Sequence, residues 1–166
     1  DIFSNVESIH ITGSPLFEQI DYNTSKNKFN KTILYAATNN DYYEVSEIVK
    51  VVNNYKDLNL VIKVHPGEES KPYRKFVNEK NIFLVTGDKV LEDLLPASTL
   101  LITTISESAL QGMLYKIPTL MLLINKKWKD LLVSLYGFDK NEDKTMVIYN
   151  KRDIKARINS LIFNDK

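Results

Sequence analysis

The chain contains no cysteine, which excludes a disulfide framework and thiolate metal sites and leaves the cellular compartment open. An excess of one charge is also missing. Acidic and basic side chains number 21 and 22, which gives a formal charge of +1. The lysines are scattered along the chain, whereas nucleic-acid binding usually needs a concentrated basic face. We therefore expect no nucleic-acid partner.

Long apolar runs are absent as well. No stretch approaches the roughly 18 apolar residues of a membrane span, and the first residues lack the charged-then-apolar order of a signal peptide. The chain begins with Asp1 rather than methionine. We expect a soluble, cytoplasmic protein and a chain that is part of a longer polypeptide.

Several catalytic signatures are missing too. The chain has no Gly-x-Ser-x-Gly elbow, no P-loop, and no second histidine or cysteine near His65. Residues 37–41 read Ala-Thr-Asn-Asn-Asp instead of a glycine-rich dinucleotide fingerprint. NAD use is therefore not expected, nor is any cofactor or metal, and no constellation supports a complete reaction within this chain.

Apolar runs of strand length alternate with amphipathic stretches of helix length. A helix is predicted after Asp41, which has the spacing of a capping pair with Glu44. The strands are nearly continuous Val, Ile and Leu runs, typical of a parallel sheet covered on both faces. The sequence predicts a Rossmann-like, doubly wound parallel α/β sheet of about six strands with helices on both faces. The strands are predicted at residues 32–37, 58–64, 81–85, 99–103, 119–123 and 145–149, and further helices at 72–80, 91–95, 105–115 and 153–163.

The composition suits one domain, since 43% hydrophobic residues are ample for one compact core. We expect residues 31–166 to form it, and residues 1–30 to be a linker or arm from a preceding N-terminal domain. Right-handed crossovers would place a topological switch point between the first and fourth strands. Thr38 and Asn39, in the loop after the first strand, are therefore candidate nucleotide ligands.

One of the two histidines lies where open α/β sheets bind their ligands. The apolar run that reaches Val64 ends on His65 and Pro66, at the carboxyl end of a predicted strand. The proline favours an extended backbone at His65 and directs its side chain out of the sheet. Lys63, two residues earlier, is expected on the same face. We interpret His65 and Lys63 as phosphate ligands, the alternative being a surface histidine before a turn.

A second candidate site is the entry to the helix predicted at residues 105–115. Thr104 and Glu107 have the spacing of a capping box, and Ser106 and Ser108 add hydroxyl groups. The unpaired N–H groups and dipole of a helix start suit a phosphate, although Glu107 can satisfy those donors itself. The segment is either a phosphate site or an ordinary, well-capped helix.

Four further positions each have two interpretations. Gln111 either bonds a ribose hydroxyl or is a solvated helix residue. Gly112 either permits close packing of helix on sheet or is simply tolerated, at a cost of about 1 kcal/mol relative to alanine. The backbone of Thr86 and Gly87, after the third strand, either lines a base pocket or forms an ordinary turn.

A mixed apolar and basic stripe occupies residues 126–136. Such a stripe is typical of a core helix, and it also suits a helix at the inner face of a membrane, where Trp and Lys are favoured. Both interpretations stay open, so peripheral membrane contact remains an alternative. The apolar positions at helical spacing are Trp128, Leu131, Leu132, Leu135 and Tyr136.

In order and spacing, these segments resemble the C-terminal, donor-nucleotide-binding domain of GT-B fold glycosyltransferases. The similar groups are bacterial capsule polysaccharide and polysialic acid transferases, the glycerol- and ribitol-phosphate polymerases of teichoic acid synthesis, and nucleotide-sugar 2-epimerases. The resemblance covers roughly residues 9–124. The segments that carry it are Ile9-His-Ile-Thr-Gly-Ser-Pro15 followed by Phe17, Ile33-Leu-Tyr-Ala-Ala-Thr38, the His-Pro motif in Lys63-Val-His65-Pro66, and residues 103–118.

Two positions depart from the family pattern. Counting back from Pro118, the glutamate that contacts ribose in the family falls at Gln111, and the small residue after it at Gly112. Gln111 can still bond a hydroxyl, but it lacks the charge. The paired serines of the family fall on Ile105 and Ser106, so one hydroxyl remains there.

The resemblance implies half of a GT-B fold. It implies that His65 is the catalytic residue that meets the donor's phosphates with Lys63, that residues 105–108 hold a phosphate or the sugar, and that Gln111 meets the ribose. The substrate would be a CMP-, CDP- or UDP-linked sugar, and the partner an N-terminal acceptor-binding domain of the same polypeptide.

The expected function is donor binding in a bacterial glycosyltransferase that makes a surface or capsular polysaccharide, with no activity in the isolated domain. A CDP-polyol phosphotransferase of the teichoic acid type would share nearly all of these features. An epimerase fits less well, because a second acidic residue near Gln111 is absent. A non-catalytic α/β interaction module with a vestigial pocket is the alternative from another class of protein.

Overall fold

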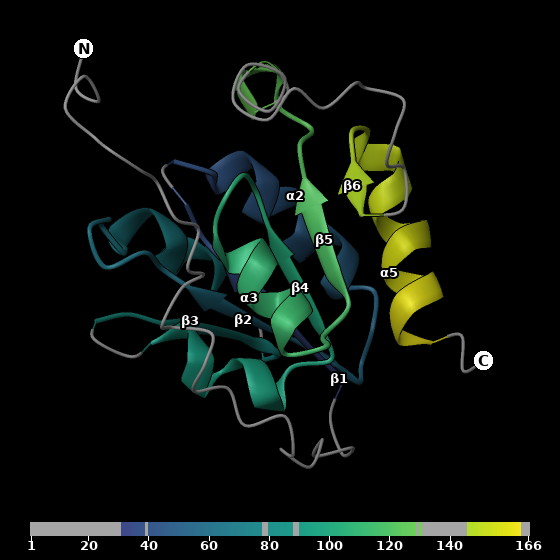
Figure 1. Ribbon diagram of the computed structural model, residues 1–166, viewed down its shortest axis with the longest axis horizontal. Coiled ribbons are helices and arrows are strands. Elements are labelled where there is room, and N and C mark those ends of the chain that lie inside the picture. Colours follow the sequence, from purple (N-terminus) through teal and green to yellow (C-terminus); the bar gives the residue numbers. More distant parts are fainter. Residues whose placement is uncertain are drawn as a thin grey trace, which may run out of the picture.

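Six parallel strands form a single sheet in the described part of the chain. The structure is a computed structural model, and it describes residues 31–38, 40–77, 80–87, 90–128, 130 and 146–163. Their spatial order is β3-β2-β1-β4-β5-β6, and every neighbouring pair is parallel. The predicted fold class is therefore confirmed (Figure 1). The strands are β1 (Lys31–Ala36), β2 (Leu58–Lys63), β3 (Ile82–Val85), β4 (Leu100–Thr103), β5 (Thr119–Leu122) and β6 (Val147–Ile148).

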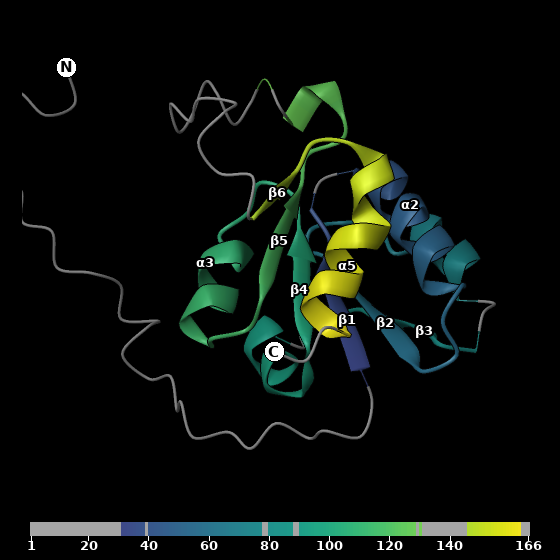
Figure 2. The same cartoon turned by 90° about the vertical axis from the view of Figure 1, so that its right-hand side faces the viewer.

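Helices cover both faces of the sheet, as predicted. Figure 2 shows α3 on one face and α2 and α5 on the other. Alternate residues of β1 belong to two separate hydrophobic cores. Ile33 and Tyr35 pack toward α2 and α5, and Leu34 and Ala36 pack on the opposite face of the sheet. Burial on both faces explains the continuous apolar runs. The α-helices with assigned bounds are α2 (Tyr42–Val52), α3 (Ser108–Leu114) and α5 (Ile154–Ile162).

Two of the predicted helices are shorter and more tightly wound than expected. The helix predicted at residues 72–80 corresponds to the 3₁₀ helix η1 (Lys71–Phe76). The one predicted at 91–95 corresponds to η2 (Leu91–Asp93), which is followed by η3 (Leu95–Ala97). A proline occupies the first turn of η1 and of η3. One turn of 3₁₀ helix suits such short connections between parallel strands. A further 3₁₀ turn, η4 (Lys151–Asp153), leads into α5.

Both predicted capping pairs are wrong. Asp41 precedes α2, but its side chain makes no capping hydrogen bond, because three donors elsewhere in the fold occupy the carboxylate. The helix predicted from residue 105 begins only at Ser108, so Thr104 and Glu107 are not its N-cap and N3 residues. The hydroxyl of Thr104 is instead hydrogen-bonded to that of Thr38.

Gly112 on α3 lies directly against the sheet, which supports the close-packing interpretation. A Cβ atom built at Gly112 would overlap Leu101 Cδ2 and lie 2.5 Å from Thr119 Oγ1. Leu101 and Thr119 are buried residues of the neighbouring strands β4 and β5. The helix α3 can therefore lie this close to the sheet because Gly112 has no side chain.

Gly112→Ala is expected to lower the free energy of unfolding by about 1 kcal/mol. Overpacking costs about 1–3 kcal/mol, and the better helix propensity of alanine offsets about 1 kcal/mol of this. Urea unfolding, followed by the fluorescence of the single tryptophan, measures the change. Met113→Ala, at an exposed position of the same helix, is the matched control and should change stability by less than about 0.5 kcal/mol. A stabilised Gly112→Ala variant would contradict this account.

Candidate functional site

The candidate site lies at the carboxyl edge of the sheet, on both sides of β1. β1 pairs with β2 on one side and with β4 on the other. The chain thus reverses its direction of travel across the sheet at β1, and the predicted switch point between the first and fourth strands is confirmed. The loops that follow β1, β2 and β4 meet at this edge, where open α/β sheets bind ligands.

Two pockets open among these loops, and both are lined by His65. The larger pocket, of about 420 Å³, is lined by Thr38, His65, Gly67, Glu68 and Ser106. The smaller pocket, of about 220 Å³, is more apolar, and one end of α3 forms part of its wall. His65 thus lies where the two pockets adjoin. The smaller pocket is lined by Ala36, Ala37, Lys63, Val64, His65, Pro66, Val90, Leu91, Glu92, Ser108 and Gln111.

His65 is held by a tight turn that fixes the role of each ring nitrogen. The backbone N–H of Gly67 donates to Nδ1 of His65 at 3.1 Å, and the N–H of Glu68 donates to the His65 carbonyl at 3.0 Å. Because Nδ1 is an acceptor, the neutral ring carries its hydrogen on Nε2. The exposed imidazole can therefore donate from Nε2 to an anionic ligand.

Lys63 lines the smaller pocket on the same side as His65, as predicted. Its side chain is 5% exposed. The Nζ atom donates to the carbonyl oxygens of Val64, at 2.9 Å, and Gly87, at 3.4 Å. Lys63 thus joins the ends of β2 and β3 and places a positive charge in the wall of the pocket. Its contact with a ligand stays a prediction.

The backbone of Thr86 and Gly87 lies just outside the two pockets. Both residues are exposed at the end of β3, and neither lines a pocket. Gly87 has a φ of +77°, which glycine adopts without strain. Its carbonyl accepts a hydrogen bond from Lys63, which lines the smaller pocket. The contact of these residues with a base stays a prediction.

The hydroxyl residues after β4 have separate positions. Ser106 lines the larger pocket and Ser108 the smaller one, and their hydroxyl oxygens lie 3.0 Å apart. Thr104 is fully buried and bonds Thr38, which lines the larger pocket. Glu107 is exposed and lines neither pocket. Of the predicted hydroxyl and acidic ligands after β4, only the two serines therefore face a pocket.

Gln111 has an acidic neighbour that the sequence analysis missed. Its Nε2 donates to Oε1 of Glu92 at 2.8 Å, and both side chains line the smaller pocket. Glu92 belongs to η2, on a different segment of the chain. No motif or periodicity marks it, because only the packing of η2 beside α3 brings the two side chains together. The smaller pocket therefore contains a carboxylate next to Gln111.

A buried network that the sequence also failed to indicate lies beneath the larger pocket. The Asp41 carboxylate is fully buried and accepts hydrogen bonds from the hydroxyls of Tyr35 and Tyr73, both at 2.8 Å, and from the N–H of Thr38 at 2.9 Å. Burial raises the pKa of Asp41 from 3.8 to about 6, although these hydrogen bonds act in the opposite direction. The network connects β1, the loop after it and η1.

Glu68 links this network to the larger pocket. Its Oε1 accepts from the N–H of Asn40 at 2.6 Å, and its Oε2 lies 3.1 Å from the Tyr73 hydroxyl. A single hydroxyl hydrogen cannot serve both Asp41 and Glu68. A proton on Asp41 resolves this, because Asp41 can then donate to Tyr73 while Tyr73 donates to Glu68.

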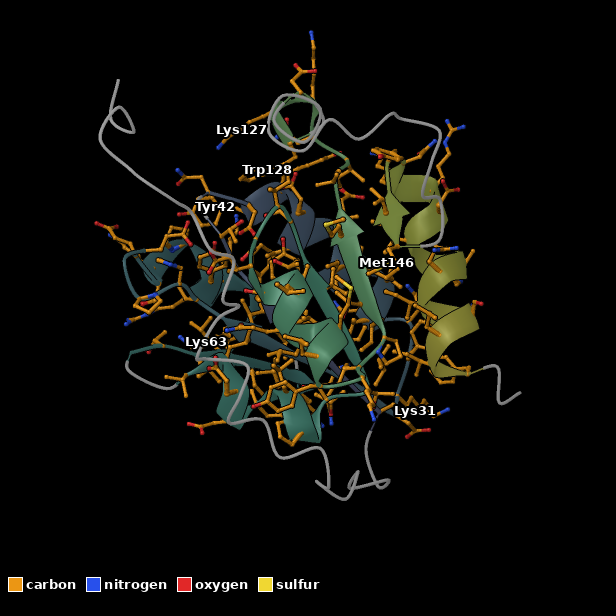
Figure 3. The ribbon with its side chains drawn as sticks, viewed as in Figure 1. Lys31, Tyr42, Lys63, Lys127, Trp128 and Met146 are labelled. Carbon is orange, nitrogen blue, oxygen red and sulfur yellow. The ribbon has the colours of Figure 1, made fainter. Side chains whose placement is uncertain are left out.

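The remaining predictions concern residues that are not among the described lining residues of either pocket. Asn39, residues 1–30 and residues 131–145 lie outside the described residues. Trp128 is 5% exposed and packs with Leu123 and Val147, and in Figure 3 its ring lies between its helical turn and the rest of the domain. Its side chain is therefore part of the core, as the core interpretation of the stripe predicts, and membrane contact by the stripe stays a prediction. None of the helices in the described part of the chain has the length and hydrophobicity to span a bilayer.

Comparison with solved structures finds the same fold in several enzymes. A variant of the wall teichoic acid polymerase TagF with CDPG has a TM-score of 0.61 and 16% identity over 87% of this chain and 35% of that chain. MnaA of S. aureus with UDP has a TM-score of 0.58 and 16% identity, over 87% of this chain and 42% of that chain. The catalytic domain of a cholesterol-α-glucosyltransferase from Helicobacter pylori has a TM-score of 0.57 and 17% identity, over 81% and 88%.

These similarities establish the fold alone, which is a Rossmann-like α/β fold of the kind predicted for one half of a GT-B fold. The chain spans less than half of the length of TagF and of MnaA. No protein-family model matches the chain, and the search of curated proteins found no match.

Proposed function

We propose that this chain is the donor-binding domain of a bacterial glycosyltransferase that uses a nucleotide-activated sugar. The observation that carries the proposal is the pair of unlike pockets joined at His65. A nucleotide-sugar has the matching layout, with an aromatic nucleoside at one end, a polar sugar at the other and phosphate between them.

The nucleoside is assigned to the smaller pocket. Its apolar wall suits a base, and the carboxylate of Glu92 and the amide oxygen of Gln111 are acceptors for ribose hydroxyls. A ribose that bonds this pair lies on the α3 side of the pocket. Lys63, on the β2 side, adds the positive charge that a phosphate needs.

The phosphates are assigned to His65, where the two pockets adjoin. When the bond between the sugar and the phosphate oxygen breaks, negative charge grows on the departing nucleotide. A hydrogen bond from Nε2 of His65 stabilises that charge, and protonation of the ring strengthens the effect. His65 thus has an electrostatic catalytic role.

The transferred sugar is assigned to the larger pocket. The hydroxyls of Thr38 and Ser106 and the carboxylate of Glu68 line it, and such groups bond sugar hydroxyls. We expect an N-terminal domain of the same polypeptide to bind the acceptor across this opening. The isolated chain is then expected to bind a donor but not to transfer it.

Structures of similar fold support a pyrimidine nucleotide, because CDPG and UDP are the ligands named for TagF and MnaA. The similarity to a wall teichoic acid polymerase also favours a second candidate, a cytoplasmic CDP-polyol phosphotransferase of surface-polymer synthesis. In that enzyme the same two pockets would hold a CDP-linked polyol, with the polyol in the larger pocket.

We expect one pyrimidine nucleotide to raise the midpoint of thermal unfolding. The panel is CMP, CDP, UDP, GDP and ADP, with 2′-deoxy-CDP and 2′-deoxy-UDP as probes of the ribose contact. A ligand that binds only the folded chain stabilises it by about 2.7 kcal/mol at a hundredfold excess over its dissociation constant. A UDP response indicates a sugar donor, and a CDP response favours the polyol. If no nucleotide shifts the midpoint at millimolar concentration, the proposal is wrong.

A further inference from the structure

We infer that the group transferred from the donor is neutral and rich in hydroxyls, and that Glu68 excludes donors whose sugar carries a carboxylate. The inference rests on the proposed function, because it concerns the contents of the larger pocket. It narrows the substrate class from any nucleotide-activated sugar to donors of a neutral sugar or polyol.

Glu68 holds a carboxylate at the wall of the larger pocket in a defined position. Oε1 accepts from the N–H of Asn40 at 2.6 Å, and Oε2 lies 3.1 Å from the hydroxyl of Tyr73. Tyr73 is fully buried, and its hydroxyl is also bound by Asp41. Both carboxylate oxygens are therefore hydrogen-bonded, and these bonds hold the Glu68 side chain in its position at the pocket wall.

Among the described residues, the larger pocket offers no lysine or arginine to a sugar carboxylate. Its described lining residues, Thr38, His65, Gly67, Glu68 and Ser106, include neither lysine nor arginine. Lys63 lines the smaller pocket instead, with its Nζ on the carbonyls of Val64 and Gly87. In our assignment His65 meets the phosphates. The fixed charge that faces the transferred group is thus the negative charge of Glu68.

This arrangement attracts hydroxyls and repels carboxylates. A carboxylate has about four lone-pair sites, so each oxygen of Glu68 can accept a sugar hydroxyl in addition to the bond it already makes. A carboxylate on the sugar would face Glu68 in a confined site. The repulsion between the two negative charges would weaken the binding of such a donor. The hydroxyls of Thr38 and Ser106 serve either kind of sugar and do not offset the repulsion.

The test compares two donors that differ only at C6 of the sugar, where glucose has a hydroxymethyl group and glucuronate has a carboxylate. UDP-glucose and UDP-glucuronate are titrated into the full chain by isothermal calorimetry, with UDP as reference, or their CDP counterparts with CDP if the nucleotide panel selects cytidine. We expect UDP-glucuronate to bind about tenfold more weakly than UDP-glucose. Glu68→Gln keeps an acceptor for Asn40 and should bring the two affinities to within about threefold, mainly by strengthening the glucuronate complex.

Glu69→Gln is the matched control, because Glu69 is exposed and lines neither pocket. It should retain the full preference for glucose. UDP is the reference in each protein, and the affinity of each sugar donor is expressed relative to it, because neutralising Glu68, which lines the same pocket as His65, strengthens the phosphate contact of all three ligands alike. Equal affinity of the wild type for the two sugars, or a preference that survives in Glu68→Gln, overturns the inference and leaves the proposed function intact. Failure of the nucleotides themselves to bind overturns both.

Discussion

Asp41→Ala is expected to lower the free energy of unfolding by about 3–5 kcal/mol at pH 5. The substitution leaves the hydroxyl of Tyr35 and the N–H of Thr38 without their acceptor, and the Tyr73 hydroxyl loses its bond to Asp41 but keeps Glu68. Each buried polar group that loses its partner costs about 1–3 kcal/mol, and typical domains are stable by only about 5–15 kcal/mol. Urea unfolding followed by the fluorescence of Trp128, the single tryptophan, measures the loss.

Asp41→Asn is expected to be at least as stable as the wild type at pH 7. The asparagine amide mimics the protonated carboxyl, because its oxygen can accept from Tyr35 and Thr38 while its NH₂ group donates to Tyr73. Tyr73 can then donate to Glu68. This variant distinguishes loss of the hydrogen-bond network, which Asp41→Ala causes, from loss of the negative charge alone.

The carboxyl group of Asp41 also makes the free energy of unfolding depend on pH, and its contribution to stability falls as the pH rises. The pKa of Asp41 is raised on folding from 3.8 to about 6 by burial, so the folded chain binds this proton more tightly than the unfolded chain does. The contribution of Asp41 is fully present below about pH 4 and is lost as the pH rises through about 6. Its size, from the difference between 3.8 and about 6, is about 3 kcal/mol.

The contribution of Asp41 is isolated by subtracting the pH profile of Asp41→Asn from that of the wild type, because other carboxylates titrate in both proteins. The difference should fall by about 3 kcal/mol between pH 4 and pH 7. Parallel profiles would show that Asp41 titrates alike in the folded and unfolded chain, and they would contradict the buried network described above.

His65→Ala is expected to weaken nucleotide binding by about 10- to 100-fold while folding is maintained. A hydrogen bond to a charged group contributes about 1.5–3 kcal/mol, and each 1.4 kcal/mol is a factor of about ten in affinity. The imidazole is exposed, so its removal leaves no cavity in the core. Calorimetric titration with the nucleotide selected by the panel measures the affinity, and urea unfolding confirms the fold.

Two further variants distinguish the roles of Nδ1 and Nε2 of His65. His65→Asn can replace Nδ1 as the acceptor for the Gly67 N–H, but it lacks a donor at the Nε2 position. His65→Gln has the opposite properties. If His65 binds phosphate through Nε2, the glutamine variant should retain more affinity than the asparagine variant. The reverse order would show that His65 acts by holding its turn and not by a hydrogen bond from Nε2 to phosphate.

The strands of this protein are readable in its sequence because their signal is local. β1, β2 and β4 are nearly continuous apolar runs that end in polar residues, and each was predicted to within one or two residues. The carboxyl end of β2 followed from Pro66, which has no backbone N–H to donate to a neighbouring strand and so ends the regular strand near His65. The location of the site at the switch point followed from the order of the elements.

Helix starts were less predictable, because polar side chains near a helix can bond groups far away in sequence. Asp41 has the spacing of an N-cap residue, but Tyr73, 32 positions later, is one of the donors that occupy its carboxylate. Thr104 bonds Thr38, which is 66 positions earlier. Spacing alone cannot show such competition, since these partners meet only when the parallel sheet aligns the loops after β1 and β4.

By itself, the sequence determined the class of fold, the two-sided burial of the sheet and the position of His65 at the end of β2, because each depends on the local pattern of apolar and turn residues. Only the tertiary structure decided which side chains line the two pockets. In the folded chain Glu92 lies beside Gln111, Glu68 lines the larger pocket, and Thr86 and Gly87 line neither pocket. The physical reason is that polar side chains interact over a few ångströms in space, and the packing of distant segments sets those distances.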